Sequence, residues 1–182
     1  MSVGTISMRY ARALLSYAGE QGAGEAIYRN MLQLLYTLMK IKELPVLLRA
    51  PSLPKKERVK IICSAVENNP VFERFATLVV DEEREELLMF IAHGYISLYR
   101  AQNKILAVEL TTAHEADTLL KEKIIGLMSN GGEYKVELQC SVDSSIIGGF
   151  ICEANSTRLD ASVARSLDNI RKKIVEENKK LV

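Results

Sequence analysis

The sequence is poor in the residues from which disulfide frameworks and metal sites are built. Only three of its 182 residues are cysteines, and no two of them form a Cys-x-x-Cys pair. Because an odd number without such spacing argues against a disulfide framework, we expect a reducing compartment. The two histidines, His93 and His114, have no companions at ligand spacing. We therefore expect neither a metal nor any other cofactor.

The sequence also lacks an excess of either charge, since 24 basic and 23 acidic residues leave a net charge of +1. A whole-chain basic field is absent, so we expect no nucleic-acid partner. No apolar run approaches the roughly 20 residues that cross a bilayer. The N-terminus also lacks the charged and long apolar regions of a signal peptide. We expect membrane association only through partner proteins.

What is present in the first hundred residues is the periodicity of successive helices. Asn69 followed by Pro70 is typical of a helix start. The charged run at 81–86 is either a break or the solvated start of a further helix. Apolar residues recur at helical spacing in roughly six segments, near 6–18, 25–41, 46–48, 55–66, 70–79 and 88–98. Short loops between them predict a helical bundle.

After about residue 103 the hydrophobic period changes from that of a helix to that of a strand. Alternation predicts strands near 106–111, 134–142 and 150–154, with a short return at 157–159. A helix is predicted near 115–128, and a last helix carries Val163, Leu167, Ile170 and Ile174 as its apolar stripe. The fold class is thus mainly α with two domains. We predict a six-helix N-terminal bundle, 1–104, and a small C-terminal α+β domain, 105–182.

Several residue groups are candidates for chemistry. Gly148-Gly149 interrupts a strand, which indicates a bulge or a close backbone approach. It matches neither the phosphate-loop nor the dinucleotide fingerprint, although a phosphate-binding loop is the functional alternative. The cysteines, Cys63, Cys140 and Cys152, are expected as small core hydrophobes. Another group is basic and is either a solvated helix face or a contact for an acidic partner: Lys55, Lys56, Arg58 and Lys60.

Five segments together resemble the delta/OSCP family of ATP synthase stator subunits, over essentially the full chain and in the expected order. They are Tyr10-Ala11-Arg12-Ala13-Leu14, Arg84 before a Leu-rich helix, Val142-Asp143, Ile146-Ile147-Gly148-Gly149-Phe150 and Leu159-Asp160-Ala161-Ser162-Val163. Two positions depart from the family pattern. Ala161 stands where glycine is usual, and Glu82-Glu83 stands where asparagine or glycine usually precedes the arginine.

The resemblance implies a non-catalytic stator subunit of bacterial type. Such a subunit links the alpha/beta catalytic head to the peripheral b stalk, on the cytoplasmic face of the plasma (inner) membrane, and thereby couples ion flow to ATP synthesis. A groove between its first and fifth helices would receive the N-terminal helix of an alpha subunit. The expected groove residues, for each of which core packing is the alternative, are Tyr10, Ala11, Leu14, Phe72, Phe75, Leu78 and Val79.

The resemblance also implies that the C-terminal domain grips the C-terminal ends of b-type stalk subunits. The contact is expected around the glycine pair and the last helix, and a purely structural role is the alternative for the glycines. The signature residues are Asp143, Gly148, Gly149, Asp160 and Ser162. Asp160 is expected to cap the last helix.

Two other function classes compete with the stator. One is a helical scaffold or adaptor unrelated to ATP synthase, and the other is a small enzyme that uses Cys152 or His114. The spacing from Gly148-Gly149 to Asp160-Ala161-Ser162 and the order of the two domains argue against the scaffold. No nucleophile motif such as Gly-x-Ser-x-Gly supports the enzyme. If the groove exists, Phe75→Asp should weaken binding of the alpha peptide while the domain stays folded.

Overall fold

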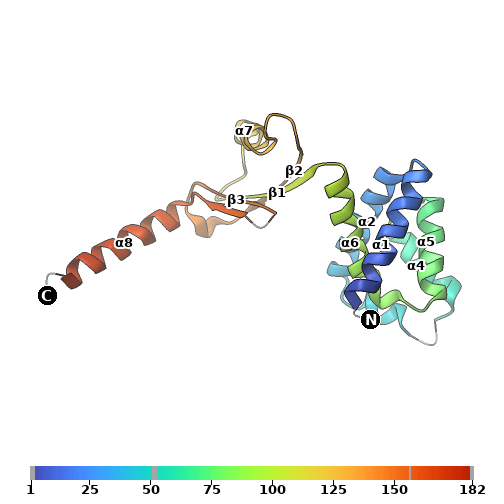
Figure 1. Cartoon of the computed structure of the whole chain (residues 1–182). Coiled ribbons are helices and arrows are strands. Elements are labelled where there is room, and N and C mark those ends of the chain that lie inside the picture. The colour runs from blue at the N-terminus through green and yellow to red at the C-terminus, as the bar shows by residue number, and fades with distance from the viewer. Residues whose placement is uncertain (1–2, 51–52, 156, 181–182) are drawn as a thin grey trace. The chain divides into compact units, whose positions relative to one another are not determined.

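The computed structural model describes residues 3–50, 53–155 and 157–180, with side chains as far as residue 174, and these residues form a mainly helical structure with a small four-stranded sheet (Figure 1). The chain divides into two compact units between Gln102 and Asn103. The first unit contains α1 (Val3–Glu20), α2 (Gly24–Lys40), α3 (Leu44–Leu48), α4 (Lys55–Ser64), α5 (Pro70–Asp81), η1 (Glu85–Leu87) and α6 (Leu88–Gln102). The second contains β1 (Ile105–Thr112), α7 (Thr118–Met128), β2 (Lys135–Val142), η2 (Ser144–Ile146), β3 (Phe150–Ala154), β4 (Thr157–Asp160) and α8 (Val163–Lys180).

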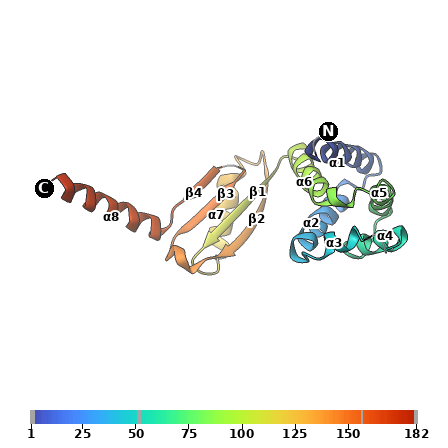
Figure 2. The same cartoon turned by 90° about the horizontal axis from the view of Figure 1, so that it is seen from below.

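The core of the first unit is built around α6, against which α1 and α2 pack (Figure 2). Tyr95 on α6 is fully buried, and its hydroxyl donates a hydrogen bond to the carbonyl of Gly24 at 3.2 Å. The rings of Tyr28 and Tyr99 stack with their centroids 4.5 Å apart. At the start of α5, the Asn69 side chain accepts the backbone N–H groups of Val71 and Phe72. The helix start expected at Asn69-Pro70 is therefore confirmed.

The charged run at 81–86 breaks the helix, because α5 ends at Asp81 and η1 begins only at Glu85. The backbone N–H of Glu83 bonds to the carbonyl of Val80, and that of Arg84 bonds to Val79. These two bonds form the Schellman motif, in which the residue after the C-cap takes the left-handed conformation. That residue is Glu83, and its φ is 55°. Glycine and asparagine adopt that conformation most readily, so Glu83 is an unfavourable residue at this position.

The charges of this region are also less solvated than their sequence indicates. Glu85 is buried, and its carboxylate oxygen lies 2.8 Å from the guanidinium of Arg58 on α4. The same guanidinium donates to the backbone carbonyls of Leu53 and Ala50. The expectation of a solvated basic face on α4 is thus wrong at Arg58, since this side chain ties α4 to η1.

The second unit is a four-stranded sheet in the order β2-β1-β3-β4. β1 and β2 are parallel and are joined through α7, whereas β3 runs antiparallel to β1 and to β4. The apolar side chains of Val108 and Leu110 on β1 point to one face of the sheet. There they pack with Cys152 of β3 and with Ile124 of α7, the helix that covers this face. The strands expected near 106–111, 134–142 and 150–154 are confirmed. The helix expected near 115 begins three residues later, after Asp117, which caps it.

The expectation for the cysteines is only partly met. Cys152 is buried in the small core of the second unit, and burial raises the pKa of its thiol. Cys63 is half-buried beside the first core, and burial raises its pKa, as does the nearby carboxylate of Glu73. Cys140 is exposed, so the core assignment is wrong there. It lies on β2, an edge strand of the sheet, and an edge strand has a neighbouring strand on only one side.

Candidate functional site

The residues expected to line a groove between α1 and α5 divide into two groups. Most belong to the core of the first unit and are at most 5% exposed: Ala11, Leu14, Phe72, Phe75 and Val79. Leu78 is 51% exposed, and Tyr10 is half-buried. Because Phe75→Asp would bury a carboxylate without a partner in this apolar core, we expect it to destabilise the first unit rather than leave it folded.

α1 and α5 meet through a contact that the sequence did not indicate. The guanidinium of Arg74 on α5 donates a hydrogen bond to the hydroxyl of Tyr17 on α1 at 3.3 Å, and it lies 5.4 Å from the centre of that ring. Tyr10 and Tyr17 are seven residues apart, so they share one face of α1, and Leu78 follows Arg74 by one turn of α5. The adjoining exposed faces of α1 and α5 thus carry Tyr10, Tyr17, Arg74 and Leu78, and we call these four residues the α1/α5 face.

The signature residues of the second unit come together where the chain enters β3 and α8. Gly149 has φ +74°, and a Cβ built there would lie 2.2 Å from the carbonyl oxygen of Ala161. The close backbone approach expected for the glycine pair is therefore confirmed. The backbone N–H of Val163 also bonds to the carbonyl of Gly148 at 3.0 Å, and that of Ala161 bonds to Phe150 at 2.9 Å. We call this junction the Gly-Gly corner, 146–149 with 160–163.

The start of α8 is held by two side chains of the corner. Ser162 is buried, and its hydroxyl oxygen accepts the backbone N–H of Arg165, so Ser162 rather than Asp160 is the capping residue. Asp160 accepts the N–H of Ser162 at 3.1 Å. Hydrogen bonds from the Ser162 hydroxyl and backbone lower the pKa of Asp160, and Arg165 and Arg158 add to the effect. The corner therefore fixes where α8 begins.

Asp143 plays the same local role before η2. Its side chain accepts the backbone N–H of Ser145 at 2.9 Å, and its own N–H bonds to the carbonyl of Thr112 on β1. Hydrogen bonds from the Ser145 hydroxyl and backbone lower the pKa of Asp143. The structure thus gives all five signature residues a part in the backbone geometry that leads from β2 to α8.

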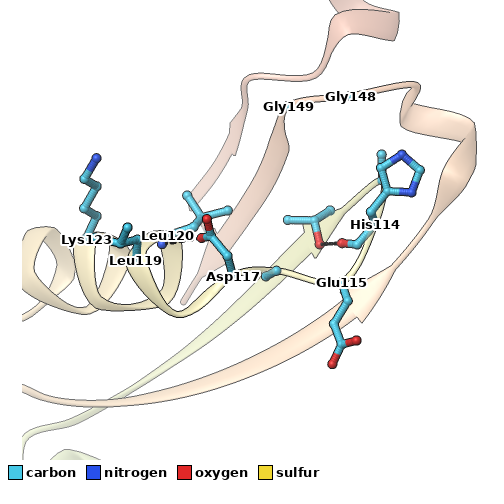
Figure 3. Close-up of a pocket in the computed structure, with 11 residues that line it drawn as sticks. His114, Glu115, Asp117, Leu119, Leu120, Lys123, Gly148 and Gly149 are labelled. Atoms are coloured by element: carbon cyan, nitrogen blue, oxygen red, sulfur yellow. Dashed lines mark hydrogen bonds between the residues drawn. The ribbon is translucent and has the colours of Figure 1, made fainter.

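An open hollow of about 530 Å³ lies between the Gly-Gly corner and the start of α7 (Figure 3). Its ionisable side chains are His114, Glu115, Asp117 and Lys123. Asp117 is occupied with the backbone N–H of Leu120, and Glu115 points away from the glycines (Figure 3). These groups do not converge as a catalytic constellation requires. Among the described residues, no group of three or more metal-ligating side chains could hold an ion.

The described part of the chain exposes apolar side chains in the second unit as well. The stripe predicted on the last helix is present on α8, but its residues are 41–55% exposed: Val163, Leu167, Ile170 and Ile174. His93 and His114 are exposed. Within the described residues, no helix has the length and apolar character needed to cross a membrane.

Comparison with known proteins gives these surfaces a context. The family model of the ATP synthase delta (OSCP) subunit matches residues 6–174. ATP synthase subunit delta of Phocaeicola vulgatus is 36% identical over all of both chains, and that of Bacteroides fragilis is equally similar over all of both chains. A chain in the mitochondrial ATP synthase hexamer of Toxoplasma gondii has the same fold, with a TM-score of 0.66 at 19% identity, and the match covers 93% of this chain and 97% of that one. This chain belongs to the ATP synthase delta (OSCP) subunit family.

Proposed function

We propose that this chain, a non-catalytic subunit of a rotary ATP synthase, holds the alpha/beta catalytic head to the peripheral b stalk. The first unit, which contains α1 to α6, is the head-binding domain. It binds the N-terminal helix of an alpha subunit. The second unit binds the C-terminal ends of b-type stalk subunits. In this arrangement the subunit lies on the cytoplasmic face of a bacterial plasma membrane, which it reaches only through its partners. The family membership sets aside the unrelated scaffold and the small enzyme as alternatives.

The observation that carries the head-binding half is the exposed apolar side chain of Leu78 on the α1/α5 face. Leu78 leaves half of its surface in water although it lies one residue from buried Val79. Tyr10 and Tyr17 add large side chains that combine apolar area with a polar tip, which suits a helix-in-groove contact. The buried residues beneath them support this surface rather than touch the partner.

The mechanical role sets the affinity that these surfaces must supply. Torque on the head demands slow dissociation, and nanomolar affinity corresponds to about 12 kcal/mol. A few anchors worth about 2 kcal/mol or more each can supply most of that free energy. Leu78 and Tyr10 are the anchors that we propose on the first unit.

Calorimetric titration with a synthetic peptide from the alpha-subunit N-terminus of the same organism tests this proposal. We expect one-to-one binding below micromolar, and Leu78→Asp should weaken it by about tenfold or more, because the new carboxylate would lose water on binding. Val46→Asp is the matched control, since Val46 is 64% exposed on α3 of the same unit. Equal affinities of the wild type and Leu78→Asp would remove Leu78 from the interface, and no binding by the folded wild type would contradict the head-binding role.

A further inference from the structure

Within the described residues of the first unit, exposed apolar side chains gather at the end of α2, along α3 and in the turn between them. Each of these side chains is at least 46% exposed: Tyr36, Met39, Ile41, Val46 and Leu47. We call these five residues the α2–α3 patch. In Figure 2, α3 lies on the opposite side of the helical bundle from α1, so the patch is separate from the α1/α5 face.

α3 carries apolar residues at its outward positions as well as at its inward ones. Leu44 and Leu48 are one helical turn apart, and both are buried in the core of the unit. Val46 and Leu47, which lie between them, are 64% and 47% exposed. Outward positions on a surface helix are ordinarily polar, and a gathering of exposed apolar side chains marks a site of contact with a partner.

Basic side chains border the α2–α3 patch. Lys40, Lys42 and Arg49 are exposed beside it, and the single acidic residue within 36–49 is Glu43. The ammonium group of Lys40 donates a hydrogen bond to the hydroxyl of Tyr36 at 3.3 Å and lies 5.4 Å from the centre of that ring. Positive charge and apolar area thus share one surface, and the partner that complements it carries apolar side chains flanked by carboxylates.

The proposed function demands more of the first unit than one peptide contact provides. The N-terminal helix of an alpha subunit is attached to the head by one end only, so a unit that holds this helix alone can still pivot when torque acts. A second contact with the head, on a different side of the unit, prevents that rotation. Two linked contacts also bind more tightly than either does alone.

We infer that the α2–α3 patch is a second contact with the alpha/beta head. Its partner is an apolar and acidic surface on the folded body of the head, outside the N-terminal helix that the α1/α5 face binds. This inference rests on the proposed function, which assigns the head to the first unit, and it adds the place of a second contact and the chemistry of the opposing surface. Loss of either contact leaves the head with only the affinity of the other.

Two other occupants fit the patch less well. A second copy of this chain would bring Lys40, Lys42 and Arg49 against the same basic residues, and like charges disfavour such a pairing. A membrane surface binds amphipathic helices that lie flat with a long apolar face towards the lipid. The apolar face of α2 packs instead in the core with α6, and α3 has only five residues.

Calorimetric titrations of the full chain with the isolated alpha/beta head, and separately with the synthetic alpha peptide, test this inference. Val46→Asp should weaken binding of the head by about tenfold or more, because it removes an apolar contact and sets a carboxylate against an acidic surface. Peptide binding should stay unchanged, which also shows that the first unit is folded. Leu127→Asp is the matched control, since Leu127 is 76% exposed on α7 of the second unit, and it should change neither affinity.

The charge of the partner is tested at two neighbouring residues of opposite sign. Lys42→Glu should weaken binding of the head several-fold at low salt and less at high salt, and Glu43→Lys should strengthen it under the same conditions. Lys172→Glu makes the same change of net charge on α8 of the second unit and should change the affinity little. Equal affinities of the wild type, Lys42→Glu and Glu43→Lys at low salt would contradict an acidic partner surface.

The remaining outcomes distinguish the inference from the function on which it rests. If Val46→Asp binds the head as tightly as the wild type does, the patch is no contact while head binding stands. If the wild type binds neither head nor peptide, the head-binding half of the proposed function fails, and the inference fails with it. Two bound peptides on the wild type but one on Val46→Asp would assign the patch to a second N-terminal helix and overturn the inference. Self-association in sedimentation, or binding to anionic vesicles, that is lost in Val46→Asp would assign it to another occupant with the same consequence.

Discussion

A Gly149→Ala substitution adds one methyl group where the chain enters β3 beside the start of α8. Residue 149 has φ +74°, and the left-handed conformation alone costs an L-residue about 1–2 kcal/mol. The new Cβ would also lie 2.2 Å from the Ala161 carbonyl oxygen, a separation that forces backbone to move. We therefore expect Gly149→Ala to destabilise the second unit by about 3 kcal/mol, the upper end of the usual range for one substitution.

Amide hydrogen exchange of the full chain is the assay for this loss, because it reports local opening free energies separately for the two units. Exchange should accelerate in β3, β4 and the first turns of α8 and stay unchanged in α1 to α6. Gly126→Ala is the matched control, since Gly126 lies within α7 with nothing within 4 Å of its added methyl group, and helix propensity predicts a gain of about 1 kcal/mol. Equal protection of β3 in the wild type and Gly149→Ala would refute the argument from strain and close approach.

The remaining predictions concern the helix junctions. Replacing Glu83, the left-handed residue after α5, by glycine should stabilise the first unit by about 1 kcal/mol in urea denaturation, and a loss of stability would contradict the Schellman ending described here. Glu85→Ala should cost about 3 kcal/mol, because it leaves the largely buried guanidinium of Arg58 without its carboxylate, and a loss below about 1 kcal/mol would show that the pair is solvated. Hydrogen bonds from Ser162 hold the pKa of Asp160 below its ordinary 3.8, so the folded state prefers the ionised carboxylate. The stability that this preference contributes is present above pH 3.8 and is lost as pH falls through the lowered pKa of the folded state. Exchange protection of α8, followed from pH 5 towards pH 2, should therefore fall less in Asp160→Asn than in the wild type.

Much of the fold could be predicted from periodicity, because helices and strands carry apolar residues at different spacing. The cap at Asn69-Pro70, the strands of the second unit and the stripe on α8 follow from local sequence alone. The glycine pair was also informative, since a close backbone approach excludes any side chain. These features depend on neighbours within a few residues.

The orientation of side chains at the surface was less predictable. Phe75 and Leu78 both lie on apolar-rich α5, but which of them faces water depends on where α4 and α2 pack, and no local pattern contains that information. Arg74 and Tyr17 are 57 residues apart, and their contact exists only in the folded unit. Glu85 belongs to a run of charges that reads as solvated, yet Arg58 from another helix makes its burial favourable.

The central claim is that one chain holds two partners at once through separate units. Sedimentation velocity of the full chain with the isolated alpha/beta head and a soluble fragment of the b-type stalk tests this most directly. The account predicts a ternary complex of head, chain and stalk fragment that forms only when the chain is present. Leu78→Asp should release the head while keeping the stalk fragment, and Ile170→Ser on α8 should do the reverse. Head and stalk fragment that compete for the chain, or that associate equally well without it, would contradict the account.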